Sequence, residues 1–422
     1  MCDPNNPNIK NRTTPQWALY QRECLWNTNK GEYPLFNTDP AEVERLAREK
    51  LSGGGWDYSA CNAGLSWTHM ANRQAFYRHR IIPRMLVDTN YRDTVSEIFG
   101  HRINAPIGFA PVGVNRIYHP TGELSPARVA NELGLPFALS SGGSYSIEDV
   151  AEANGDGLRF FQLYQAHDDE LAISMLTRAA KSGYNACIFT VDTWSLGWRH
   201  NDVAAGNYTF YKEHGASDIG LQDPVFQKRL KEAGIDPVKD YKLAGAKWGD
   251  AIWHGRAFTW EKAKWSMEQW KRVSGNKPFV LKGIQSVEDA EKAVEMGFDG
   301  IVVSNHAGRQ VDGAVASLDA LEKIVDAVGD KTTIIFDSGI RSGADVFKAL
   351  ALGAKMVFVG RLWIWGLGIA GEHGVRHVMK SLLADFDILM ELAGYCTVKD
   401  ITRKALDSLP ATANLMPTTS EI

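Results

Sequence analysis

Gly300-Ile301-Val302-Val303-Ser304-Asn305 is a short apolar run that ends in polar residues. Such a run is typical of a strand in a parallel sheet that helices cover on both faces. Seven similar runs alternate with helical stretches along the chain and cover residues 107–111, 137–141, 159–164, 186–192, 278–283, 333–337 and 356–360. Eight strand-helix units predict an α/β fold with a closed (β/α)₈ TIM barrel, and a doubly wound open sheet is the alternative.

Polar side chains stand at or just beyond the carboxyl ends of nearly all these runs. They are Ser140, Gln162, Tyr164, Thr190, Asp192, Lys282, Asn305, His306, Asp337 and Arg361. In a (β/α)₈ barrel this end carries the active site. An open sheet does not require a polar residue at almost every strand end, so the pattern favours the barrel and one functional mouth.

The barrel is expected to span residues 105–403, with an N-terminal extension of residues 1–104 and a C-terminal tail of residues 404–422. The first 35 residues are rich in Asn, Pro and Thr, which predicts an irregular arm on the barrel or on a neighbouring subunit. A helix is predicted to begin after Asp39, with Pro40 at its first position, and to end at Gly53-Gly54-Gly55.

The connection between the fourth and fifth strands is unusually long. Its tryptophans are Trp248, Trp253, Trp260, Trp265 and Trp270. Functional loops of this length commonly cover an active site. We therefore predict a lid insertion at about residues 200–277, with a subunit-contact segment as the alternative.

Composition restricts the partners. The chain has 44% apolar residues and a net charge of −4, which is typical of a globular protein without a basic surface for nucleic acid. Its 5 cysteines are scattered, which predicts neither a metal site nor a disulfide framework. No signal peptide or membrane span is recognisable, so the prediction is a cytoplasmic protein without a membrane partner.

Two glycine-arginine loops follow the seventh and eighth strands. They are Asp337-Ser338-Gly339-Ile340-Arg341 and Gly360-Arg361. Barrels bind phosphate at this place, although glycines here also make tight turns. A separate run, Gly366 to Gly371, matches a dinucleotide fingerprint but does not directly follow a strand. Close helix packing explains that run better, so NAD is disfavoured.

His306 and Arg309 follow the sixth strand together, and Asp192 and Arg199 follow the fourth. An imidazole takes a proton near neutral pH, and a guanidinium binds a carboxylate with a planar fork. An aspartate near the histidine stabilises its charged form. Lys282, at the end of the fifth strand, is costly to bury without an anionic partner such as a reduced flavin. These residues predict deprotonation of a substrate that carries a carboxylate.

Six motifs lie at these strand ends: Phe161-Gln162-Leu163-Tyr164, Thr190-Val191-Asp192-Thr193, Leu281-Lys282-Gly283, Ser304-Asn305-His306 with Arg309-Gln310, Asp337-Ser338-Gly339-Ile340-Arg341, and Gly360-Arg361. Together they resemble the FMN-dependent L-2-hydroxy acid oxidase and dehydrogenase family, which includes glycolate oxidase, lactate oxidase and lactate 2-monooxygenase. The resemblance runs from about Trp56 to about Arg403.

The resemblance implies FMN as the cofactor and a role for each matching residue. The residues that match the phosphate-binding positions are Gly339, Arg341, Gly360 and Arg361, and Asp337 matches the position that binds the ribityl chain. The residues that match the isoalloxazine site are Val112, Gly113, Ser140, Gln162, Thr190 and Lys282. The residues that match the substrate carboxylate site are Tyr58, Arg199 and Arg309. Tyr164 matches a residue near the substrate hydroxyl, and His306 matches the base, with Asp192 assisting it.

Within the family the sequence is most similar to lactate 2-monooxygenase, through Gly197-Trp198-Arg199, Asp223 to Lys228, and Trp253-His254-Gly255. That likeness implies oxidation of a small L-2-hydroxy acid by O₂ to a shortened acid and CO₂, with the lid retaining the product. It also implies a homotetramer or a larger homo-oligomer. Gly142 replaces a larger pocket residue of the relatives and is expected to enlarge the pocket. Ala307 replaces a usual glycine, and Leu362 a usual proline.

Three other functions remain open. An oxidase would release the keto acid and H₂O₂, and a dehydrogenase would pass electrons to another acceptor. An isomerase of a phosphorylated substrate would use the same cofactor without net oxidation. The pairing of Arg199 and Arg309 with His306 favours a carboxylate substrate over a second phosphate.

Overall fold

The computed structural model describes residues 7–206, 218–253 and 255–410. Cys2, His254, residues 207–217 of the predicted insertion and residues 411–422 of the predicted tail lie outside the described residues. In the described ranges, no helix is both long and apolar enough for a membrane crossing. Within the same ranges, no three His, Cys, Asp or Glu side chains gather as a metal site would need.

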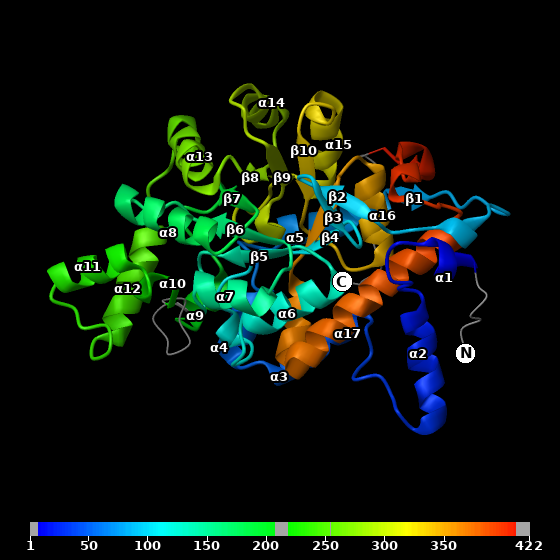
Figure 1. Cartoon of the computed structure of the whole chain (residues 1–422), viewed down its shortest axis with the longest axis horizontal. Coiled ribbons are helices and arrows are strands. Elements are labelled where there is room, and N and C mark those ends of the chain that lie inside the picture. The colour runs from blue at the N-terminus through cyan, green and yellow to red at the C-terminus, as the bar shows by residue number, and fades with distance from the viewer. Residues whose placement is uncertain (1–6, 207–217, 254, 411–422) are drawn as a thin grey trace.

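Eight parallel strands close into a barrel, which confirms the predicted fold and excludes the open sheet (Figure 1). They are β4 (Ile107–Phe109), β5 (Phe137–Ser140), β6 (Arg159–Leu163), β7 (Ala186–Thr190), β8 (Phe279–Ile284), β9 (Gly300–Val303), β10 (Thr333–Phe336) and β11 (Met356–Val359). The strands follow one another around the ring in chain order, and β11 pairs with β4 to close it. All eight carboxyl ends therefore meet at one mouth.

Helices follow the strands and surround the barrel (Figure 1). They are α6 (Leu124–Leu133), α7 (Ile147–Asn154), α8 (Asp169–Lys181), α13 (Trp260–Ser274), α14 (Val287–Glu295), α15 (Ser317–Val328), α16 (Gly343–Ala351) and α17 (Arg361–Ala393). Five of them begin after a Ser, Thr or Asp whose side chain accepts a backbone N–H of the first turn. Such caps fix where each strand-to-helix loop ends.

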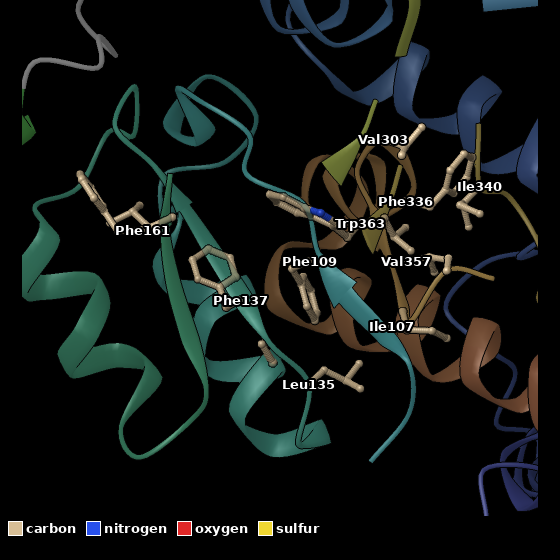
Figure 2. Packing of buried hydrophobic residues seen from close by; sticks show 14 of the residues in the cluster. Ile107, Phe109, Leu135, Phe137, Phe161, Val303, Phe336, Ile340, Val357 and Trp363 are labelled. Atoms are coloured by element: carbon tan, nitrogen blue, oxygen red, sulfur yellow. The ribbon is translucent and has the colours of Figure 1, made fainter. Parts of the chain in front are cut away.

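The core has two layers because alternate strand residues point to opposite faces of the sheet. Phe160, Ile188 and Phe358 belong to a cluster of side chains inside the barrel. Phe109 and Trp363 belong to the larger cluster between strands and helices, shown in Figure 2. Burying each large side chain contributes about 1.5–3 kcal/mol. The two layers make the barrel a rigid frame for its loops.

A hairpin packs against the inner layer. It consists of β2 (Ser96–Ile98) and β3 (His101–Ile103), paired antiparallel. Ile98 and Ile103 join the inner cluster, and Phe99 meets Phe160 edge to face at 6.1 Å. A second small sheet pairs β1 (His79–Ile81) with β12 (Leu406–Ser408). Residues 406–408 of the predicted tail are thus tied to the N-terminal region.

The prediction of an irregular arm is wrong for part of the N-terminal region. Helices α1 (Pro7–Asn11) and α2 (Leu19–Asn27) form there. Helix α3 (Pro40–Lys50) begins as predicted, with Asp39 accepting two backbone N–H groups. The three glycines after it begin α4 (Gly53–Ala60), because the Ser52 side chain caps the Gly55 N–H. Helix α5 (Trp67–Tyr77) follows.

The stretch between β7 and α13 exceeds a normal barrel loop. It contains α9 (His200–Ala204), α10 (Asp218–Leu221), α11 (Pro224–Glu232) and α12 (Tyr241–Ile252). Helix α13 itself packs on α8, and the buried Trp270 donates to the Pro278 carbonyl at 2.9 Å. Residues 260–274 of the predicted 200–277 insertion are therefore part of the helical ring. The extra stretch ends before Trp260.

The run from Gly366 to Gly371 lies inside α17, which bends at Ala370 and Gly371. A Cβ on Gly366 would meet the Gly374 carbonyl oxygen at 2.7 Å. Close helix packing, as predicted, therefore requires glycine at this position. The remaining short elements are 3₁₀ helices, η1 (Thr28–Lys30), η2 (Thr89–Tyr91), η3 (Asn115–Ile117), η5 (His306–Gly308), η6 (Val398–Asp400) and η7 (Arg403–Ala405).

Candidate active site

A cavity of about 410 Å³ opens at the carboxyl ends of the strands. Loops after β4, β6 and β7 to β11 line it, together with α4. The predicted site residues on its wall are Tyr58, Val112, Gly113, Tyr164, Arg199, Lys282, His306, Arg309, Asp337, Gly339, Arg341, Gly360 and Arg361. Residues far apart in the sequence thus meet in one place, as expected from strand ends of a barrel.

The four other predicted residues are Asp192, Ser140, Gln162 and Thr190, which lie behind the wall. Ser140 Oγ donates to Gln162 Oε1 at 3.0 Å, and Gln162 Nε2 donates to Thr190 Oγ1 at 2.8 Å. This buried ladder joins the ends of β5, β6 and β7. Since each partner satisfies the next, the ladder holds these three strand ends in a fixed arrangement.

His306 begins the turn after β9 and forms a hydrogen bond with Asp192. The Nδ1 to Oδ1 distance is 2.8 Å. Thr193 Oγ1 donates to the same carboxylate oxygen at 2.6 Å. A carboxylate at Nδ1 favours the tautomer with the proton on that nitrogen. His306 Nε2 is then the unprotonated nitrogen of an imidazole that lines the cavity.

Burial lowers the pKa of His306, although the charge of Asp192 opposes this shift. Burial alone would raise the pKa of Asp192, but His306, Lys282 and the hydrogen bonds to the carboxylate hold it below its usual range. The pair at neutral pH is therefore a neutral imidazole beside an ionised carboxylate. This is the state in which Nε2 can accept a proton.

The loop that carries the base has an uncommon backbone. His306 and Ala307 have φ of 56° and 58°, and Gly308 follows with φ of 77°. Left-handed geometry costs a residue with a Cβ about 1–2 kcal/mol, so Ala307 keeps a conformation that a glycine adopts freely. The Ala307 N–H donates to Ser338 Oγ at 3.0 Å. A Cβ on Gly308 would meet the His69 backbone nitrogen at 2.7 Å.

Arg199, which is buried, and Arg309, which is half-buried, face the same cavity. Arg309 Nη1 donates to the Tyr58 carbonyl at 2.7 Å and the Cys61 carbonyl at 3.0 Å. Arg199 Nη2 donates to Gln310 Oε1 at 2.9 Å, and its Nε donates to the Arg309 carbonyl at 3.2 Å. Burial and the charge of Arg309 lower the pKa of Arg199. A bound carboxylate would relieve the repulsion between these cations.

Lys282 differs from its prediction in one respect. Its Nζ lies 3.5 Å from Asp337 Oδ2 and donates to Ser304 Oγ at 3.2 Å. Asp337 is therefore the anionic partner of Lys282, whereas the sequence had suggested a reduced flavin for that role. Ser338 Oγ donates to the other Asp337 oxygen at 2.8 Å. The lysine is held in place before any ligand binds.

Two further arginines, Arg341 and Arg361, line the cavity, and Arg361 lies beside Arg309 because both donate to the Cys61 carbonyl. Burial, with the charge of Arg73, lowers the pKa of Arg341 to about 10. Burial, with Arg309 and Arg341, lowers the pKa of Arg361 to about 9. In the part of the chain that the structure describes, neither Arg341 nor Arg361 forms an ion pair with a carboxylate. Cations of this kind fit the phosphate of a cofactor.

Several functional residues escaped the sequence reasoning because they lie before the first barrel strand. Arg361 Nη2 donates to Asn62 Oδ1 at 2.7 Å, and Arg361 Nη1 to His69 Nδ1 at 3.3 Å. Asn72 and Asn305 exchange amide hydrogen bonds of 2.8 and 2.7 Å. Helix α5 therefore supports both the arginine and the histidine loop. No motif in that region signalled this role.

The cavity wall near Tyr164 is aromatic. Trp253, which follows α12, lies 5.0 Å from Tyr164 between ring centroids. A Cβ on Gly142 would meet Trp253 Cη2 at 2.9 Å. The expectation that Gly142 enlarges the pocket is therefore wrong, because an indole from the insertion already takes that space.

Comparison with known proteins agrees with this site. A family model described as FMN-dependent dehydrogenase matches residues 47–408. An FMN-dependent alpha-hydroxy acid dehydrogenase of Penicillium citrinum is 44% identical over 90% of this chain and 92% of its own length. An L-lactate oxidase of Lysinibacillus sphaericus is 38% identical over 89% of this chain and 96% of its own. The crystal structure of a mandelate oxidase superposes with a TM-score of 0.76, at 36% identity over 89% of this chain and 99% of its own.

The fold and the site define a flavin-dependent oxidoreductase barrel, and the chain belongs to the FMN-dependent dehydrogenase family. FMN is its cofactor. The residues present fit that group, since half-buried Arg341 and buried Arg361 form no ion pair with a carboxylate among the described residues and Asp337 orients Lys282. The reaction is the FMN-dependent oxidation of an alpha-hydroxy acid.

Proposed function

We propose that this enzyme oxidises a small, lactate-like L-2-hydroxy acid with O₂ and releases the 2-keto acid and H₂O₂. The observation that carries the proposal is the His306–Asp192 pair on the same cavity as Arg199 and Arg309. An oxidase is supported by relatives named lactate oxidase and mandelate oxidase. None of the relatives above is named as a monooxygenase.

Substrate binding uses the cations of the cavity wall. Arg199 and Arg309 hold the carboxylate, with the Tyr58 hydroxyl beside them, because two guanidinium groups facing one cavity favour a charge-assisted contact to an anion. Asp202, 3.9 Å from Arg199 Nη1, balances part of their charge. Tyr164 lies near the substrate hydroxyl. The carboxylate is fixed before the reaction, so the carbon that carries the hydroxyl group is directed towards His306.

Proton transfer is the task of the His306–Asp192 pair. The unprotonated Nε2 accepts a proton from the substrate, and the imidazole becomes a cation. Asp192, 2.8 Å away and ionised, stabilises that cation. Bound FMN supplies a two-electron acceptor. Lys282 would offset negative charge on the reduced cofactor.

Cofactor binding is assigned to the remaining wall. Gly339 and Gly360 let backbone approach the phosphate, while Arg341 and Arg361 neutralise it, and Asp337 binds the ribityl chain. The isoalloxazine is assigned to Val112, Gly113 and the ladder of Ser140, Gln162 and Thr190.

The fate of the keto acid separates the proposed oxidase from its alternatives. FMN-loaded protein is mixed with L-lactate and O₂, with and without catalase, and the products are identified. The oxidase yields pyruvate when catalase removes the peroxide. Acetate and CO₂ in the presence of catalase would establish the monooxygenase type instead. If the substrate bleaches the flavin without O₂ but the reduced enzyme does not react with O₂, the protein is a dehydrogenase that uses another acceptor.

We further propose a cytoplasmic homotetramer or larger homo-oligomer. Helix α2 supports assembly, because none of its residues is buried and Leu25 and Trp26 are 66% and 48% exposed. Helix α2 contacts α17 through Tyr20, whose hydroxyl lies 2.6 Å from His377 Nδ1, while the side chains of Leu25 and Trp26 remain available to another subunit. Sedimentation velocity tests this proposal, and a monomer at micromolar concentration would contradict it.

A further inference from the structure

Trp253 enters the cavity from outside the barrel ring. The backbone N–H of Trp253 donates to the Gly249 carbonyl at 2.8 Å, in the last turn of α12. The Gly255 N–H donates to the Trp194 carbonyl at 2.9 Å, beyond the other end of this short segment. The tryptophan is therefore anchored on both sides, by the insertion and by the loop after β7.

The indole occupies a site between three loops. It packs on Val114 together with Tyr58, and it lies 5.0 Å from Tyr164 at an interplanar angle of 56°. It also lines the cavity that contains His306. One side chain thus borders both the proposed carboxylate site, through Tyr58, and the proposed hydroxyl site, through Tyr164.

Gly142, on the loop after β5, makes room for this indole. A Cβ at Gly142 would lie 2.9 Å from Trp253 Cη2 and 3.3 Å from Cζ2. Gly142 is absent from the glycines with positive φ, so its backbone conformation does not demand glycine. Glycine is required here because Trp253 occupies the space that a Cβ would take. The two residues form a complementary pair that a methyl group would break.

The position of Trp253 limits the room for the substrate side chain. A 2-hydroxy acid has its carboxylate at Arg199 and Arg309 and its hydroxyl near His306 and Tyr164, which leaves two positions on C2, one for the hydrogen and one for the side chain. We place the side chain of the L enantiomer at the wall near Tyr58 and Tyr164, where Trp253 stands. A short aliphatic group fits beside a fixed indole, whereas a phenyl ring requires the indole to move.

We propose that Trp253 is the specificity-determining residue that restricts the substrate to 2-hydroxy acids with a short aliphatic side chain, and that Gly142 is its required partner. This inference rests on the proposed function and deepens it. The insertion after β7 thereby sets substrate size.

Substrate preference gives the first test. FMN-loaded wild type, Trp253→Leu and a control, Trp265→Leu on α13, are each mixed anaerobically with L-lactate or L-mandelate, and the rate of flavin bleaching is measured. Trp253→Leu is expected to shift the ratio of kcat/KM towards mandelate by about tenfold or more. The control should keep the wild-type ratio. An active Trp253→Leu enzyme with an unchanged ratio, or a wild type that prefers mandelate, would overturn the proposal.

A stability cycle tests the pair without any reaction. Gly142→Ala is made in the wild type and in Trp253→Leu, and the Tm of each FMN-loaded protein is measured. The alanine should lower Tm in the wild type and leave it nearly unchanged in Trp253→Leu, because the clashing atoms are gone. Equal shifts in both backgrounds would refute the complementary packing. If no L-2-hydroxy acid bleaches the wild type, the proposed function itself fails, whereas unchanged preference in active variants refutes only the role of Trp253.

Discussion

Replacing Asp192 by Asn tests the catalytic pair through charge alone. The amide has nearly the size of the carboxylate, so the cavity keeps its shape while the negative charge beside His306 disappears. His306 Nδ1 and Asp192 Oδ1 are 2.8 Å apart, and the two side chains are only 19% and 10% exposed. The charge centres of such a pair are about 4 Å apart, which corresponds to about 4 kcal/mol at an effective dielectric constant of about 20.

That energy is realised only when His306 has taken the proton, so its loss raises the barrier of the proton-transfer step. Each 1.4 kcal/mol is about tenfold in rate, so Asp192→Asn should slow flavin reduction about a thousandfold. The assay is anaerobic stopped-flow bleaching with saturating L-lactate. FMN content, measured from the absorbance spectrum, should match that of the wild type.

Thr193→Val is the matched control. It removes the hydrogen bond of 2.6 Å to Asp192 but keeps the charge, so the rate should fall by about tenfold at most. Asp192 raises the pKa of His306, so the acidic limb of the pH profile should move to lower pH in Asp192→Asn. A rate within tenfold of wild type, or a limb that moves to higher pH, would refute the reasoning.

Four further predictions concern the surrounding residues. Arg309→Met should raise KM for L-lactate about 10- to 100-fold in steady-state assays, since it removes a charge-assisted contact to the carboxylate. Arg361→Met should weaken FMN binding about tenfold or more in fluorescence titrations, and unaltered affinity would contradict the phosphate site. Gly283→Ala should lower stability by about 1–3 kcal/mol in urea unfolding, because φ is +109° and its Cβ would lie 2.8 Å from Asp192 Cβ. Burial, with nearby arginines, lowers the pKa of His69 from 6.5 to about 2, so its stabilisation is present above pH 6.5 and lost as pH falls below it. His69 alone should contribute a loss of about 1.4 kcal/mol per pH unit there, so the slope measured for FMN-free protein should be smaller by about that amount in His69→Gln.

The barrel was predictable because its signal is local and repeated. Each strand is a short apolar run with a polar end, and neighbouring strands in the ring are neighbours in sequence. His306, Lys282 and Asp337 each follow such a run directly, so their meeting at one mouth follows from topology. The phosphate loops carry glycines and arginines together, which is a local signal as well.

The remaining contacts depend on tertiary packing that no local pattern encodes. Asn62 and His69 reach Arg361 from the N-terminal region, across sequence separations of 299 and 292 residues. Helix α2 was missed because its face has no apolar periodicity that marks an amphipathic helix. The pocket near Gly142 was misjudged for a related reason. A glycine indicates free space only when the residue opposite it is known, and Trp253 comes from an insertion whose path the sequence does not reveal.

The most direct test of the account is the anaerobic reduction of FMN-loaded His306→Ala by L-lactate. The wild type should bleach within seconds. The variant should retain FMN and the wild-type spectrum yet bleach at least about a thousandfold more slowly, since the group that accepts the substrate proton is gone. A variant that bleaches at a near-normal rate would remove His306 from the role of base and contradict the mechanism.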